Sequence, residues 1–157
     1  MQAVLHAPRG LAPFRHFGID DPLRSRSESR DGEFMEMLAA YRVVGGLATG
    51  AEIAARRPDV GISQLARWIA EREVLAFEWH ENLWLPVFQF ERAALAMREA
   101  PRSVIRELSG VLDGWELARW FVAPNAWLSD RSPIDVIEED FSQVFDAARA
   151  HRFACAG

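Results

Sequence analysis

The fold is decided by residues 49–90, TGAEIAARRPDVGISQLARWIAEREVLAFEWHENLWLPVFQF. Thr49 and Glu52 form a capping box, in which a hydroxyl and a carboxylate satisfy free backbone donors at the start of a helix, here predicted over 50–57. Apolar residues then repeat at helical spacing, which predicts a second helix over 63–72. The segment therefore begins with two short helices joined by a turn.

A β-hairpin is expected directly after this helix pair. The period changes to strand-like runs over 74–79 and 83–90, and the polar residues His80-Glu81-Asn82 between them suit a hairpin turn. Pro86 has no backbone N–H, so the second strand is expected at a sheet edge or with a bulge. Two helices followed by a hairpin are the order of a winged helix-turn-helix, whose second helix enters the major groove of DNA.

Helices are expected on both sides of this segment. Before it, apolar residues at helical spacing predict a helix over 34–44, and the stretch from Gly45 to Gly50 is interpreted as a plain interhelix turn. After it, apolar stripes and capping pairs predict helices over 101–112, 114–121, 133–139 and 141–151. The predicted fold class is therefore mainly α: a helix-turn-helix pair with a small β-hairpin, followed by a C-terminal helical unit.

The composition divides the 157 residues into three parts. Residues 1–32 are rich in Pro, Gly, Ser and Arg and have too little apolar surface to order themselves, so they are expected to form a flexible N-terminal arm. Residues 33–92 form the helix-turn-helix and hairpin part, and residues 93–157 form the C-terminal helical part. All six tryptophans lie from Trp68 to Trp127, which centres the predicted core on that window.

Composition also excludes several functions. All 18 basic residues are arginine, which excludes a lysine Schiff base or a P-loop lysine, and the net charge of −5 argues against coating nucleic acid or a membrane. A single cysteine, Cys155, allows no intrachain disulfide and fits a cytoplasmic protein. The sequence shows no nucleophile with a base, no metal-ligand spacing and no cofactor loop. We therefore expect a protein that is not an enzyme and has no metal or cofactor.

The predicted helix over 63–72 is a candidate for DNA recognition. The residues expected to face base edges are Gln64, Arg67 and Glu71, and those expected to meet phosphates are Arg56, Arg57 and Arg72. A homodimer would place two such helices about one turn of DNA apart. The alternative is a helix pair that only packs.

The C-terminal part carries an ordered set of motifs, namely Trp120-Phe121, Pro124-Asn125, Leu128 and Pro133-Ile134-Asp135. In spacing and residue type this set resembles the C-terminal toxin-binding domain of the Xre/MbcA/ParS antitoxins of bacterial toxin–antitoxin pairs. The family commonly has a glycine directly after the leucine, whereas Ser129 and Asp130 follow it here. The resemblance implies a C-terminal unit that binds a toxin, often one that consumes NAD, and an N-terminal helix-turn-helix that represses the operon.

The residues expected at the partner contact are Trp120, Pro124, Asn125, Trp127, Arg131, Pro133, Arg149 and Arg152. Trp127 would anchor the contact from a turn between helices, and the arginines would clamp carboxylates or phosphates. In the alternative, Trp127 packs inward beside Leu128 and the arginines only complement a helix dipole. The predicted function is that of an antitoxin. The alternatives are an orphan winged-helix DNA-binding regulator and a non-catalytic protein–protein adaptor.

Overall fold

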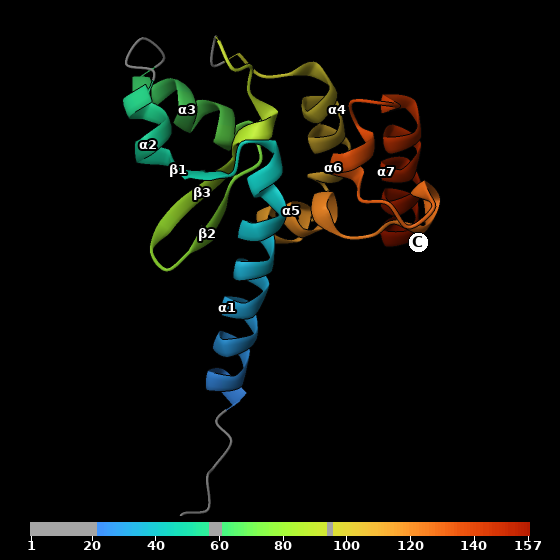
Figure 1. Ribbon diagram of the computed structural model, residues 1–157, viewed down its shortest axis with the longest axis horizontal. Coiled ribbons are helices and arrows are strands. Elements are labelled where there is room, and N and C mark those ends of the chain that lie inside the picture. The colour runs from blue at the N-terminus through green and yellow to red at the C-terminus, as the bar shows by residue number, and fades with distance from the viewer. Residues whose placement is uncertain (1–21, 57–60, 94–95) are drawn as a thin grey trace, which may run out of the picture.

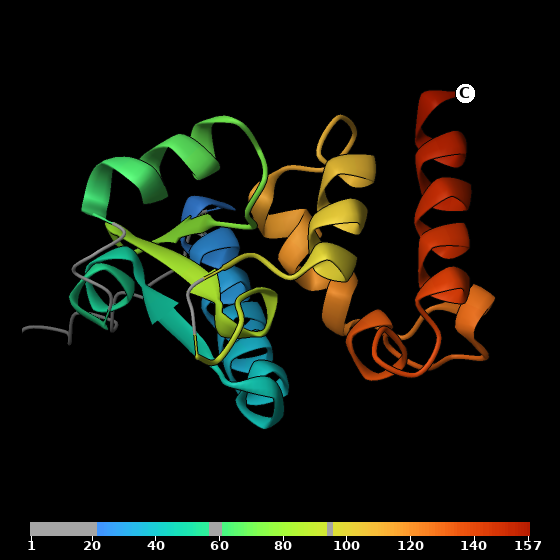
Figure 2. The same ribbon diagram turned by 90° about the horizontal axis from the view of Figure 1, so that it is seen from above.

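The computed structural model describes residues 22–56, 61–93 and 96–157. Its helices and strands, in chain order, are α1 Pro22–Tyr41, β1 Leu47–Thr49, α2 Gly50–Arg56, α3 Gly61–Ala70, β2 Phe77–Trp79, β3 Asn82–Pro86, α4 Glu99–Leu108, α5 Gly114–Val122, α6 Pro133–Val136 and α7 Phe141–Ala156. Three short 3-10 helices are η1 Arg42–Val44, η2 Val87–Gln89 and η3 Ala126–Leu128. Figures 1 and 2 show the α2–α3 pair and α7 at opposite ends of the molecule. The mainly helical fold with a small hairpin confirms the predicted fold class.

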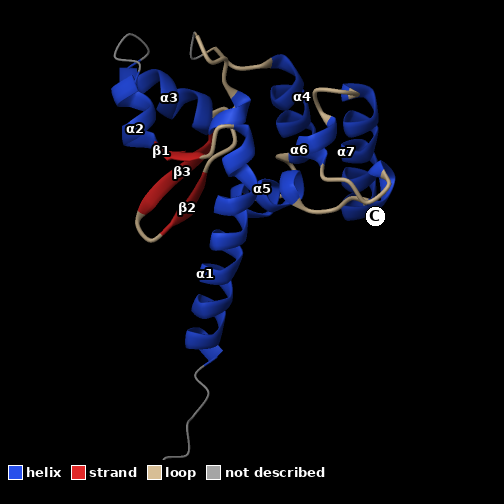
Figure 3. Ribbon diagram, in the orientation of Figure 1, coloured by secondary structure: helices blue, strands red, loops and turns tan. Residues whose placement is uncertain are grey.

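The sheet is antiparallel and three-stranded, with the order β1-β3-β2 (Figure 3). The hairpin β2–β3 was predicted, but β1 lies within the stretch interpreted as a plain turn. The prediction that Pro86 marks an edge strand or a bulge is wrong, because β3 is the central strand. Pro86 is tolerated there as the last residue of β3, opposite Leu47. The next residue, Val87, continues the pairing by donating its N–H to the carbonyl of Gly46 at 2.9 Å.

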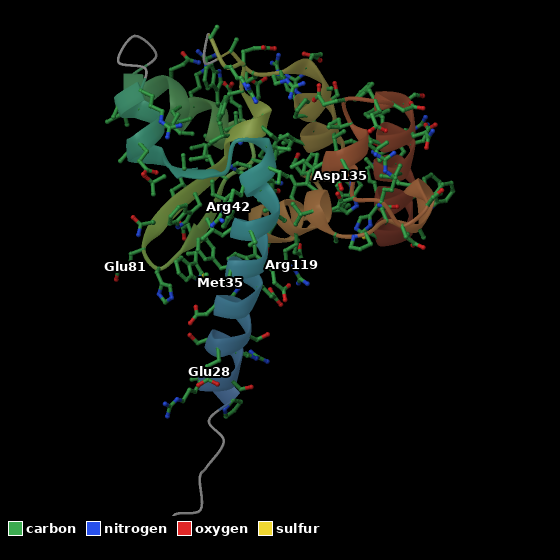
Figure 4. The ribbon with its side chains drawn as sticks, in the orientation of Figure 1. Glu28, Met35, Arg42, Glu81, Arg119 and Asp135 are labelled. Atoms are coloured by element: carbon green, nitrogen blue, oxygen red, sulfur yellow. The ribbon has the colours of Figure 1, made fainter. Side chains whose placement is uncertain are left out.

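Helix α1 begins at Pro22, well before the start predicted at residue 34. The prediction of a flexible arm is therefore wrong for residues 22–32, while the rest of that arm, residues 1–21, lies outside the described residues. Residues 22–30 are exposed, and in Figure 1 the first turns of α1 extend beyond the body of the molecule. The ion pair between Arg24 and Glu28 at 3.5 Å, one helical turn apart, supports this exposed end, where Figure 4 labels Glu28.

The second half of α1 is fixed between the hairpin and α5. Phe34 stacks on the ring of Trp79, with centroids 3.7 Å apart. Glu33 accepts a hydrogen bond from Trp115 Nε1 at 3.0 Å and pairs with Arg119 at 3.4 Å, and Figure 4 shows Arg119 beside α1. These contacts hold the N-terminal helix against both predicted parts of the chain.

Buried apolar side chains form two clusters. The larger joins α1, β2 and η2 to helices α4 to α7, and at its centre the hydroxyl of Tyr41 donates to the carbonyl of Ala118 at 2.7 Å. Burial raises the pKa of Tyr41 well above its usual value. The smaller cluster lies between α2, α3 and the sheet, around Ile53, Leu65 and Leu85. The parts predicted at 33–92 and 93–157 therefore share the larger core.

An ion-pair cluster also links the two parts. Glu73, which follows α3, accepts a hydrogen bond from Arg102 Nη2 of α4 at 2.6 Å and another from Arg106. The side chain of Glu73 is only 14% exposed, so solvent screens these contacts less than it screens a surface pair. Among the helices of the described ranges, none is both long and apolar enough to cross a membrane.

Candidate functional site

The turn between α5 and α6 presents Trp127 to solvent. Its residue surface is 70% exposed, whereas that of the neighbouring Leu128 is 3% exposed. Asn125 closes the turn: its side-chain oxygen accepts from the N–H of Trp127 at 3.0 Å, and its carbonyl accepts from the N–H groups of Leu128 at 2.9 Å and Asp130 at 3.0 Å. The turn is therefore fixed from within while its indole points outward. The alternative in which Trp127 packs inward is wrong.

The backbone of this turn is strained. Ser129 and Asp130 both lie in the left-handed region, with φ of 55° and 61°. For residues with a side chain this conformation costs about 1–2 kcal/mol each. Ser129 directly follows Leu128, so the residue noted in the sequence after this leucine occupies a backbone position that favours glycine. Such strain persists only where the surrounding structure over-determines it, and it is concentrated at functional sites.

The three arginines of the predicted contact have different surroundings. Arg131 donates from Nη1 and Nη2 to the carboxylate of Glu139, at 2.8 and 3.0 Å, and thereby lowers the pKa of Glu139. Arg152 pairs with Glu107 at 2.8 Å and ties α7 to α4. Arg149 is exposed and, among the residues the structure describes, has no ion pair. Of the three, only Arg149 presents a guanidinium that is free for a partner.

Helix α7 is longer than predicted and adds an aromatic residue to the same face as Arg149. Phe153 lies four residues after Arg149, so the two side chains are neighbours on the helix surface. It is 81% exposed. Sequence reasoning missed Phe153 because the last helix was expected to end at residue 151, although the helical period continues to it. Trp127 of η3 and the pair Arg149 and Phe153 of α7 are the exposed residues that we group under the name C-terminal surface; η3 and α7 are in contact.

Other residues of the predicted contact belong to the core. Trp120 is 8% exposed, and its ring meets the edge of Phe121 at a centroid distance of 5.4 Å. Pro133 is buried at the start of α6. The prediction that Trp120 and Pro133 touch a partner is therefore corrected, because both shape the fold beneath the surface. Pro124 is exposed next to Asn125, which acts through the turn that it closes.

The recognition residues predicted on α3 carry little net charge. Arg67 is exposed, but it pairs with Glu71 on the next turn at 2.9 Å. Gln64 is half-buried. The face of α3 therefore offers a donor and an acceptor that already bind each other, and it is not a basic stripe.

The residues predicted to meet DNA phosphates are not gathered on one face. Arg72 turns toward the other half of the molecule, where its Nη1 donates to the carbonyl of Ser109 after α4. Its predicted phosphate contact is corrected for that reason. Arg56 is exposed at the end of α2, and Arg57 lies outside the described residues.

The C-terminal surface suits recognition of another protein. Exposed aromatic rings fill apolar pockets, and a free guanidinium binds carboxylates. Within the described ranges, no three His, Cys, Asp or Glu side chains lie close enough to share a metal ion. In comparisons with protein-family models, curated proteins and solved structures, nothing matches this chain.

Proposed function

We propose that this protein is an antitoxin-like protein that binds and neutralises a partner toxin through the C-terminal surface, without catalysing a reaction. The observation that carries the proposal is the exposed ring of Trp127 on a fixed and strained turn. Holding a large aromatic ring in water forgoes the favourable burial of apolar area. A partner pocket would recover that energy, and a fixed turn lowers the ordering cost of binding.

The chemistry of the surface describes the partner. We expect the partner to have an apolar pocket that accepts the indole of Trp127 and a carboxylate that pairs with Arg149. The motif set around Trp120, Asn125 and Pro133 supports a toxin as this partner, since its likeness is to the toxin-binding domain of antitoxins. Toxins bound by that family often consume NAD, which is the activity to assay first in the product of an adjacent gene.

The variant Trp127→Ala in the full chain tests this proposal. Removing an aromatic anchor is expected to weaken binding to the adjacent gene product by about 2 kcal/mol or more, which is roughly thirtyfold, and to abolish protection in co-expression. Because Trp127 is exposed, the melting temperature should change little. The matched control is Met35→Ala, which removes a 60% exposed side chain from α1 and should leave protection intact.

Equal protection by Trp127→Ala and the parent chain would rule out the C-terminal surface. Truncation after Asp113 is not a clean test, because Trp115, Phe121 and Val144 belong to the same core as Phe34. Point variants leave that core in place.

We propose operator DNA binding by a homodimer as a second function, through α3. The observation that favours it is the order of a helix, a strand, two helices and a hairpin around a β1-β3-β2 sheet. Arg67→Ala should weaken binding to the DNA upstream of the gene in a gel shift, and Arg26→Ala on the exposed end of α1 is the control. If the parent chain prefers that DNA no more than random DNA, the second function is excluded while the first stands.

A further inference from the structure

A cleft of about 840 Å³ lies between the N-terminal half and α6, on residues that the C-terminal surface does not include. Its size is within the range of small-molecule sites. Its apolar lining is Val43, Val44, Ile53, Val87, Phe88, Phe90, Ile134 and Ile137. These side chains come from η1, α2, η2, α6 and the residues next to them, so the cleft exists only because the two halves pack together.

The walls of the cleft are fixed by Arg98. Its Nη1 donates to the carbonyl of Phe88 at 3.1 Å, and its Nη2 pairs with Glu138 after α6. The backbone N–H of Arg98 also donates to the carbonyl of Gln89 at 2.9 Å. One residue thus connects both sides, which makes the cleft a preformed feature of the fold.

The charged groups that remain at the cleft are mainly positive. Arg56 and Arg92 both line it, are exposed, and have no ion pair within 4 Å among the described residues; Glu52, one turn before Arg56 on α2, attracts Arg56 only at longer range. Glu91 is the one lining carboxylate that Arg98 does not neutralise. Two exposed guanidinium groups without a hydrogen-bonded carboxylate, beside an apolar floor, are complementary to a molecule with an apolar body and an anionic end.

We propose that this cleft binds a small amphipathic anion, with its hydrocarbon or aryl body on the apolar floor and its carboxylate at Arg56 and Arg92. The floor accounts for affinity through burial of apolar area, and the two guanidinium groups account for the choice of charge. The site does not depend on a partner toxin, so it is testable on the isolated protein.

Isothermal titration calorimetry of the full chain with octanoate, octan-1-ol and octylamine separates two contributions to affinity. The three molecules share one alkyl chain and differ in the charge of the head group. We expect octanoate to bind at least tenfold more tightly than octan-1-ol, and octylamine to bind most weakly. Arg56→Gln and Arg92→Gln should each raise the Kd of octanoate about tenfold and leave that of octan-1-ol unchanged. The control Arg26→Gln, on the exposed end of α1, should change neither.

A pair of variants at Val43 tests whether octanoate binds in this cleft. Val43 is 79% exposed and lines the cleft, so polar substitutions there spare the core. Val43→Glu should weaken octanoate binding severalfold, whereas Val43→Lys should retain or tighten it. The proposal would be overturned if octanoate and octan-1-ol bound with equal affinity. It would also be overturned if the Kd of octanoate stayed the same in all of the variants at Val43, Arg56 and Arg92.

Discussion

Ser129 carries a conformational cost that a single substitution relieves. Its φ of 55° is left-handed, and glycine adopts this region without a Cβ clash. We expect Ser129→Gly to raise the free energy of unfolding by about 1 kcal/mol, measured by urea denaturation. The control is Ser142→Gly in the first turn of α7, which should lower that free energy by about 0.5 kcal/mol. A loss of stability in Ser129→Gly would show that the turn is not strained.

The sequence predicted helix caps better than it predicted which individual side chains are exposed to solvent. The capping box predicted for Thr49 and Glu52 is confirmed by both of its hydrogen bonds, at 2.7 and 3.2 Å, because a cap depends only on neighbours along the chain. Which of Trp127 and Leu128 faces solvent was not predictable, since a turn has no period that assigns its faces. The pairing of Arg152 with Glu107 likewise depends on the tertiary fold.

The packing of α5 against the hairpin depends on one glycine. A Cβ at Gly114 would lie 2.0 Å from the carbonyl oxygen of Ala76, which is backbone and cannot rotate away. We expect Gly114→Ala to lower the free energy of unfolding by about 2 kcal/mol or more, because α5 must then move off the strand. Gly110→Ala is the control, since no atom lies within 4 Å of its added Cβ. Equal melting temperatures for the two variants would contradict this close contact.

Elements whose own sequence carries an apolar period, a cap or a turn signal were predictable, whereas strand β1 and the first turns of α1 were not. The helix predicted over 114–121 is α5, found at Gly114–Val122. Strand β1 has three residues, too few to show an alternation, and it forms because β3 has a free edge beside it. The first turns of α1 were missed because an exposed helix end rich in Arg, Ser and Glu has the composition of a disordered segment.

For the whole molecule, Glu73 makes the junction between the halves sensitive to pH. The hydrogen bond from Arg102, followed by that from Arg106, lowers the pKa of Glu73. Because the pKa is lower in the folded chain than in the unfolded chain, the carboxylate contributes stability that is complete above the unfolded value of about 4.3 and is lost as the pH falls through the folded value. The halves are therefore expected to hold together less firmly in acid.

The variant Glu73→Gln measures this contribution by urea unfolding at two pH values. Its free energy of unfolding should be lower than that of the parent chain at pH 7, and the difference should narrow at a second, acidic pH low enough to protonate the parent carboxylate. The control Glu36→Gln, at an exposed position of α1, should have the same free energy of unfolding as the parent chain at both pH values. A difference that is equally large at both pH values would assign the effect to packing.

The outward position of Trp127 also gives the chain an optical reporter. Of the six tryptophans, Trp127 alone is exposed, while the others are buried or half-buried. Iodide ions quench the emission of indoles that they can reach, so they act chiefly on this ring. A partner that covers it would shield it from iodide and shift its emission to shorter wavelengths. Occupancy of the C-terminal surface can thus be followed in the natural protein without a label.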